Sequence, residues 1–191
     1  ARDLHEDERR PLDELFPHFV GHMGHQTPMI RRLALTCVVH VLPFQPNVLD
    51  QHMQNLLQAL SNLTKDPESE TRQLVCKALC RLLEIRFDQL LPMMPQVIEF
   101  MLTAMQDDDD TVAMEACEFW AVYCEEGSDA LDLLKQYLPR LIPLLMQKMV
   151  YGDDELLDLD AEDEANANVK DRAEDIRPVQ HKSQVHGAGG D

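Results

Sequence analysis

Three histidines stand at a spacing that could bind a metal ion. His18, His22 and His25 follow one another at i, i+4 and i+7 in a stretch with helical periodicity, and imidazoles on one helical face can serve as Zn²⁺ ligands. No carboxylate completes a known metal motif such as H-E-x-x-H. We therefore interpret the three as the polar face of a helix that carries Phe16 and Phe19 on its other side, and we predict no metal site.

Two acidic segments could bind cations or basic partners. A calcium loop beginning at Asp158 is rejected because Asp163 stands where an EF-hand needs glycine. The run Asp107–Asp110 joins two helical stretches, and two interpretations of it stay open. Asp110 could cap the following helix and interact with its dipole, or the run could contact Lys or Arg of a partner.

Residue patterns for covalent catalysis are missing. None of the serines stands in a G-x-S-x-G turn, and no glycine-rich phosphate loop occurs. Five cysteines are an odd number without a C-x-x-C pair, so we expect core thiols in a reducing compartment rather than disulfides. We predict no enzymatic activity and no cofactor, and we expect the ten methionines to fill the core as well. The cysteines are Cys37, Cys76, Cys80, Cys117 and Cys124.

Composition and charge exclude further classes of protein. The chain has 191 residues, of which 45% are hydrophobic, which is enough for one domain with a real core. A formal net charge of −18 argues against nucleic acid as the main ligand and favours basic protein surfaces as partners. No apolar run approaches the ~20 residues that span a bilayer, and no basic-then-apolar leader is present, so neither a membrane span nor secretion is expected.

The elements that must position these residues are helices. Apolar residues recur at i, i+3, i+4 and i+7 in seven stripes, and no hairpin signal or sustained alternation indicates strands. Thr27 and Pro28 have the residue types expected at the cap and first position of one helix. The sequence therefore predicts an all-α fold. The stripes cover 12–23, 30–41, 49–60, 74–83, 90–105, 112–123 and 134–149.

The helices come in pairs that repeat. Arg31, Arg72 and Ala113 stand at 41-residue intervals in the second helices of successive pairs, and a period of about 40 with two helices is typical of a HEAT-repeat α-solenoid. Both ends look uncapped, so we expect a segment of a longer solenoid that self-associates or is marginally stable alone. We predict the end of a preceding repeat over 1–10, repeats over 11–45, 46–86, 87–126 and (incomplete) 127–150, and an acidic loop with a linker-like tail over 151–191.

One string of residues is more specific than this helical pattern. Glu115–Trp120, E-A-C-E-F-W within Thr111–Trp120, resembles the transportin (karyopherin-β2) family of nuclear import receptors. The resemblance extends from about Arg10 to Pro178, and it implies a long superhelix of which this chain contains about four repeats and the start of an acidic loop. Further similar stretches are Arg81–Arg86, Leu90–Pro92, Tyr137–Pro143 and Asp175–Pro178.

The resemblance also implies partners and a site. Members of the family bind Ran in its GTP form, cargo with basic or proline-tyrosine nuclear localisation signals, and phenylalanine-glycine nucleoporins, while shuttling between cytoplasm and nucleus. Their acidic loop couples Ran binding to cargo release. The matching residues here would contact basic surface on Ran or compete with basic cargo; they are Asp153, Asp154, Glu155, Asp158, Asp160, Glu162, Asp163 and Glu164.

A second interpretation stays open. The repeats alone are equally compatible with a structural HEAT scaffold, such as the regulatory arm of a phosphatase. The acidic stretch 153–175 discriminates between the two, because a scaffold of uniform repeats has no need of it.

Overall fold

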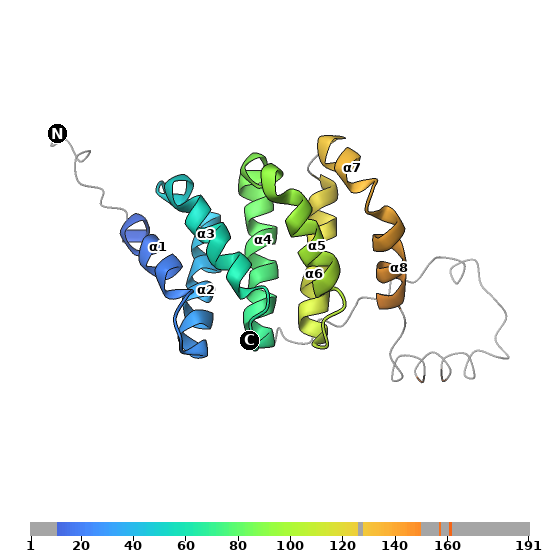
Figure 1. Cartoon of the computed structure of the whole chain (residues 1–191), viewed down its shortest axis with the longest axis horizontal. Helices are drawn as coiled ribbons and strands as arrows, with labels where there is room; N and C mark the ends of the chain where they lie inside the picture. The colour runs from blue at the N-terminus through green and yellow to red at the C-terminus, as the bar shows by residue number, and fades with distance from the viewer. Residues whose placement is uncertain (1–10, 126–127, 150–156, 158–160, 162–191) are drawn as a thin grey trace. The chain divides into compact units, whose positions relative to one another are not determined.

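The computed structural model describes residues 11–125, 128–149, 157 and 161. Within the longer of these ranges, every regular element is an α-helix or a 3₁₀ turn (Figure 1), which confirms the predicted all-α class. The elements are α1 (Pro11–His22), α2 (Pro28–Val41), η1 (Leu42–Phe44), α3 (Leu49–Leu63), α4 (Ser69–Leu90), η2 (Leu91–Met93), α5 (Met94–Ala104), α6 (Asp110–Glu125), α7 (Ser128–Leu134) and α8 (Leu138–Lys148).

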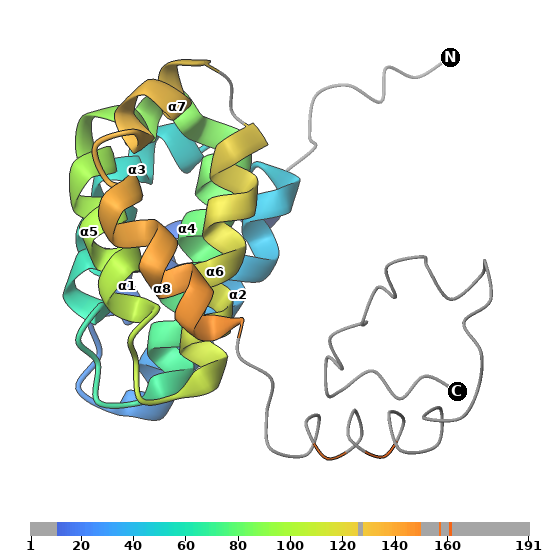
Figure 2. The ribbon, with the colours of Figure 1, turned by 90° about the vertical axis from the view of Figure 1, so that its right-hand side faces the viewer.

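The helices of residues 11–148 form two layers. In one layer α4 packs between α2 and α6, and in the other α1 packs against α3, and α5 against α8. Figure 2 shows α1, α3 and α5 on one side and α2, α4 and α6 on the other. Each helical hairpin buries its apolar face only by stacking on its neighbours, as in an α-solenoid. The repeat boundaries given above stay a prediction.

The buried faces of α1 and α2 follow the predicted stripes, with Phe16 and Val38 buried, but individual positions differ. On α2, Leu35 is fully buried while Leu33 is 51% exposed, and on α1 Leu15 is 45% exposed. Within the described residues α2 packs against α1, α4 and η1, and no helix covers the side that carries Leu33. The buried face is therefore set by the neighbours, which sequence periodicity alone does not identify.

The prediction of one helix over 134–149 is wrong, because this range is divided between α7 and α8. The chain leaves helical geometry after Leu134, and α8 begins at Leu138 with Pro139 in its first turn, where a missing backbone N–H costs nothing. Of the predicted stripe, Met146 and Met149 are 65% and 78% exposed. No helix among the described residues packs on that side of α8, so the stripe lacks the neighbour that would bury it.

Two arginine–aspartate pairs join successive helical hairpins. Arg31 Nε donates to Asp66 Oδ2 over 2.7 Å, and Arg72 donates from Nε and Nη2 to both carboxylate oxygens of Asp107, each over 2.7 Å. Each arginine also donates from Nη1 to two backbone carbonyls of the turn before its own helix. Each of the two guanidinium groups therefore joins the turn before its own helix to the equivalent turn of the next hairpin, 41 residues later in the sequence.

A bend in α4 is fixed by bonds to the start of α3 and to the turn before it. Arg86 leaves helical geometry at φ −147° and ψ 44°. Its Nε donates to Asp50 Oδ1, and its Nη1 to Gln45 Oε1, each over 2.8 Å. These bonds hold the end of α4 against the first turn of α3 and the turn that precedes it.

Candidate partner-binding surfaces

An apolar groove lies between α3 and α5. It has a volume of about 180 Å³, and Leu60, Leu79 and Val97 are buried in it while Phe100 is half-buried. An apolar cavity of roughly 150 Å³ binds benzene in other proteins, so this groove has the size for one aromatic ring. We call it the α3–α5 groove; its lining is Leu57, Leu60, Ser61, Thr64, Leu79, Met93, Gln96, Val97 and Phe100.

The α3–α5 groove continues into a second hollow whose lining includes charged side chains. The second hollow has a volume of about 260 Å³ and shares Thr64 and Phe100 with the first. It ends at Lys65 and at the Arg72–Asp107 pair. A ligand in the groove would therefore find an apolar pocket at one end and charged groups at the other.

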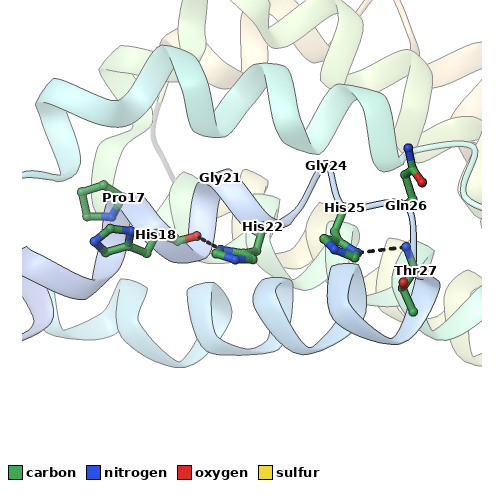
Figure 3. Close-up of a pocket in the computed structure, with 8 residues that line it drawn as sticks. All are labelled: Pro17, His18, Gly21, His22, Gly24, His25, Gln26 and Thr27. Atoms are coloured by element: carbon green, nitrogen blue, oxygen red, sulfur yellow. Dashed lines mark hydrogen bonds between the residues drawn. The ribbon is translucent and has the colours of Figure 1, made fainter.

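A polar trough follows α1 and the turn after it (Figure 3). One hollow of about 670 Å³ is lined on α1 by His18 and His22, and on the turn by His25. A second hollow of about 400 Å³ shares with it a strip of residues without polar side chains and extends to α3. We call this strip, Pro17, Gly21 and Gly24, the α1 strip, and the α3 side of the trough carries His52, Asn55, Gln58 and Asn62.

Two of the three histidine rings, those of His22 and His25, make hydrogen bonds within this trough. His22 Nδ1 lies 2.7 Å from the carbonyl oxygen of His18, which can only accept, so Nδ1 carries the proton. His25 Nδ1 accepts the backbone N–H of Thr27 over 3.0 Å. In the part of the chain that the structure describes, no group of three His, Cys, Asp or Glu side chains is arranged to hold a metal ion.

His25 occupies the turn position that aspartates hold in the next two hairpins. Asp66 and Asp107 follow it at 41-residue intervals, and each accepts through Oδ1 the backbone N–H two residues later, over 3.0 Å. His25 makes the same bond through Nδ1 to Thr27. The predicted cap residue Thr27 makes no side-chain cap, although Pro28 does begin α2; here the residue that organises the turn is His25.

The acidic run before α6 is a structural turn, and its predicted capping residue is wrong by one position. Asp109, not Asp110, binds the first turn of α6 through Thr111 N and Oγ1, at 2.9 and 2.6 Å. Hydrogen bonds from Ser69 and Thr111 lower the pKa of Asp109 to about 2. The hydrogen bonds from Arg72 lower the pKa of Asp107. Asp107 and Asp109 are therefore hydrogen-bonded within the chain, Asp110 Oδ1 lies 3.8 Å from Lys148 Nζ, and Asp108 and Asp110 are exposed.

Charges also link the layer formed by α2, α4 and α6. Arg32 pairs with Glu70, and Lys77 Nζ lies 3.4 Å from Glu115 Oε2. Burial raises the pKa of Glu115, although Lys77 acts in the opposite direction. Because Glu115 is partly buried, its negative charge opposes folding.

The predicted acidic site lies outside the described residues. This holds for every member of the set: Asp153, Asp154, Glu155, Asp158, Asp160, Glu162, Asp163 and Glu164. Of residues 150–191 the structure describes only Leu157 and Ala161, both helical and exposed. The acidic site stays a prediction.

Several sulfur-containing side chains are not in the core as expected. Cys124 is exposed and Cys37 and Cys117 are half-buried, whereas burial raises the pKa of Cys80 to about 12 and that of Cys76 further. Met29 and Met114 are 58% and 56% exposed. Trp120 lies on the buried side of α6, where its Nε1 donates to Met105 Sδ over 3.0 Å. The expectation that the cysteines and methionines fill the core is therefore wrong for Cys124, Met29 and Met114.

The sequence analysis predicts neither the two surfaces nor the two arginine–aspartate pairs, Arg31–Asp66 and Arg72–Asp107, which we call the arginine–aspartate ladder. The ladder has a signal, since an aspartate follows each arginine by 35 residues in both copies, Asp66 after Arg31 and Asp107 after Arg72. The grooves have none, because their walls come from helices far apart in the sequence. No described helix is long and apolar enough to cross a membrane.

Comparison with known proteins assigns the chain to a family. It is 39% identical to mouse Transportin-1 over 176 residues, 92% of the chain and 20% of that protein. It is also 39% identical to Importin subunit beta-2 of Schizosaccharomyces pombe, over 92% of the chain, and 33% identical to Transportin of Dictyostelium discoideum, over 96%. The chain is a transportin-family segment. No protein-family model matches it.

The transportin-family segment spans about one fifth of the length of the curated relatives it matches. A more distant relative, Importin subunit beta-1 of Arabidopsis thaliana, is 26% identical over 122 residues. Within the transportin-family segment the string Glu115–Trp120 lies on α6, where it supplies the charge pair of Glu115 and the buried side chains of Ala116, Phe119 and Trp120.

Proposed function

We propose that the segment belongs to a nuclear import receptor that binds Ran-GTP and carries proteins with proline-tyrosine nuclear localisation signals through the nuclear pore. The observation that carries this proposal is the 39% identity to Transportin-1 over 92% of the chain. Such a receptor shuttles between cytoplasm and nucleus and works without enzymatic chemistry. Cargo and Ran-GTP oppose each other's binding through a coupling free energy, which is reciprocal by thermodynamic necessity.

The charge of the chain supports basic partners. Its formal net charge is −18, and the acidic stretch from Asp153 to Glu164 adds to it. We propose that this stretch meets basic surface on Ran or competes with basic cargo, and so couples Ran binding to cargo release. Such an interaction acts mainly on association rate and specificity and weakens as salt rises.

The α3–α5 groove supports the nucleoporin part of the proposal. Its apolar floor and volume of about 180 Å³ suit one phenylalanine ring, and the exposed Ser61 and Gln96 at its rim leave the ring access. A Ser61→Trp variant would fill the groove from its rim. We expect it to abolish binding of a synthetic Phe-Gly repeat peptide, whereas Gln54→Leu, on an exposed part of α3 outside the groove, leaves binding unchanged.

Deletion of residues 153–175 from the full-length protein tests the receptor mechanism. In a receptor the deletion should retain cargo binding but weaken the release of cargo by Ran-GTP. A HEAT scaffold, the alternative supported by the repeats alone, would keep its partner binding after the same deletion and would show no Ran-dependent release in either form. Unchanged Ran-dependent release after the deletion would contradict the role given to the acidic stretch.

A further inference from the structure

The polar trough along α1 combines a bare helix edge with two rows of uncharged hydrogen-bonding groups. The α1 strip (Pro17, Gly21, Gly24) forms the edge that both hollows share. A Cβ added at Gly21 or Gly24 would meet nothing within 4 Å. The space above the strip is therefore open, and backbone of a ligand could approach the helix closely there.

The row on the α1 side includes both a hydrogen-bond donor and an acceptor among its histidines. His22 uses Nδ1–H on the carbonyl of His18, which leaves its Nε2 as an acceptor. His25 accepts Thr27 N–H at Nδ1, which places its proton on Nε2 as a donor. Figure 3 shows both rings beside the α1 strip. A donor next to an acceptor is what the C=O and N–H groups of a peptide backbone require.

The row on α3 repeats this chemistry with amides. Asn55, Gln58 and Asn62 are exposed, and each side-chain amide holds a donor and an acceptor. Gln58 Nε2 donates to Asn62 Oδ1 over 3.2 Å, which leaves the Gln58 carbonyl and the Asn62 amino group available to a ligand. From His52 to Asn62 the helix rises by about 15 Å, the length of four or five residues of extended chain.

The equivalent groove of the next hairpin has a different lining. The α3–α5 groove has Met93, Gln96 and Phe100 at the positions 41 residues after His52, Asn55 and Ala59. The residues that line the trough include no Asp, Glu, Lys or Arg side chain. An uncharged ligand therefore fits the trough better than a basic or an acidic one.

We propose that the trough along α1 binds an uncharged, extended peptide segment through its backbone. The inference is independent of the aromatic ligand assigned to the α3–α5 groove, because it rests on different residues. The occupant is a glycine-, serine- or asparagine-rich stretch of a partner, whose small side chains let its backbone lie on the α1 strip. Backbone recognition of this kind gives weak binding, since each neutral hydrogen bond contributes about 1 kcal/mol net.

The test uses the full 191-residue chain and a capped decapeptide of Gly, Ser and Asn without aromatic residues. Two-dimensional ¹H–¹⁵N NMR should show shifts of Gly21, Gly24 and the side-chain amides of Asn55 and Asn62. An N-methylated version of the peptide, which lacks the backbone N–H donors, should not cause them. The variant Asn55→Leu/Asn62→Leu should weaken binding roughly tenfold.

Two further variants keep the result interpretable. Gly21→Gln adds bulk into open space and should block the trough without disturbing the fold, and Gln54→Leu is the matched control outside both grooves. Shifts that are equal in all variants, or no shifts at all, would overturn the inference. Binding that is lost in Ser61→Trp but kept in Gly21→Gln would place the peptide in the α3–α5 groove and overturn it too, while leaving the proposed function intact.

Discussion

The Arg72–Asp107 pair is predicted to be a main bond between consecutive hairpins. The two side chains are 20% and 13% exposed and share two hydrogen bonds of 2.7 Å. Exposed ion pairs contribute about 0–1 kcal/mol, and breaking buried pairs costs about 3–5 kcal/mol. For this intermediate case we expect Asp107→Ala to lower the free energy of unfolding by about 2 kcal/mol, or the Tm by about 4–8 °C.

The exposed pair Arg81–Glu84 on the same helix provides the matched control. Its side chains are 51% and 39% exposed, so Glu84→Ala should change stability by less than about 0.5 kcal/mol. Urea unfolding followed by circular dichroism measures both variants. Asp107→Asn keeps an acceptor for Asp109 N and loses the charge, so its cost should lie between the two. An Asp107→Ala cost no larger than that of Glu84→Ala would refute the role given to the ladder.

The remaining predictions concern pH, buried polar groups and association. Arg72 lowers the pKa of Asp107 below its ordinary 3.8, so the stability that this pair contributes is present above about pH 4 and is lost as the pH falls below it. In acid unfolding, Asp107→Asn should therefore lose less stability below about pH 4 than the parent chain. Thr71 Oγ1 is buried and has no hydrogen-bonding partner among the described residues. Thr71→Val should therefore stabilise the chain by about 1 kcal/mol in urea unfolding. A lower unfolding midpoint would show that the hydroxyl has a partner. Burial raises the pKa of Glu115 above its ordinary 4.5, so the charge of Glu115 opposes folding at pH 7. Glu115→Gln should therefore raise the midpoint of urea unfolding at pH 7 but not at pH 4. A lower midpoint at pH 7 would mean that the attraction of Lys77 outweighs the cost of burial. Met146 is 65% exposed on α8, so Met146→Lys should increase the monomer fraction in analytical ultracentrifugation, and equal association of both chains would exclude this surface.

The helices and their pairing follow from the sequence because the period of the apolar residues is a local property. The stripes that become α3 and α5 are buried as predicted, including Met53, Leu56, Val97 and Ile98. The 41-residue interval places Arg31 and Arg72 at equivalent positions, and both make the same bonds to the turns. The predicted membership of the transportin family is confirmed by the relatives.

The faces that carry partners could not be predicted in the same way. Periodicity cannot tell which side of a helix has a neighbour, so Leu33 and Met146 were assigned to stripes although they are exposed. The wall of the trough combines Gly21 with Asn55, which meet only after α1 and α3 pack together. The three histidines were recognised as a polar face, but the bond from Thr27 to His25 depends on a turn geometry that residue spacing does not reveal.

The most direct test of the receptor assignment is a pull-down of the full-length protein with Ran in its GTP form and in its GDP form at physiological salt. The account predicts strong retention of Ran-GTP and little of Ran-GDP, because a receptor of this kind must distinguish the two states to release cargo in one compartment. Equal binding of the two forms, or binding of neither, would contradict it and leave a HEAT scaffold.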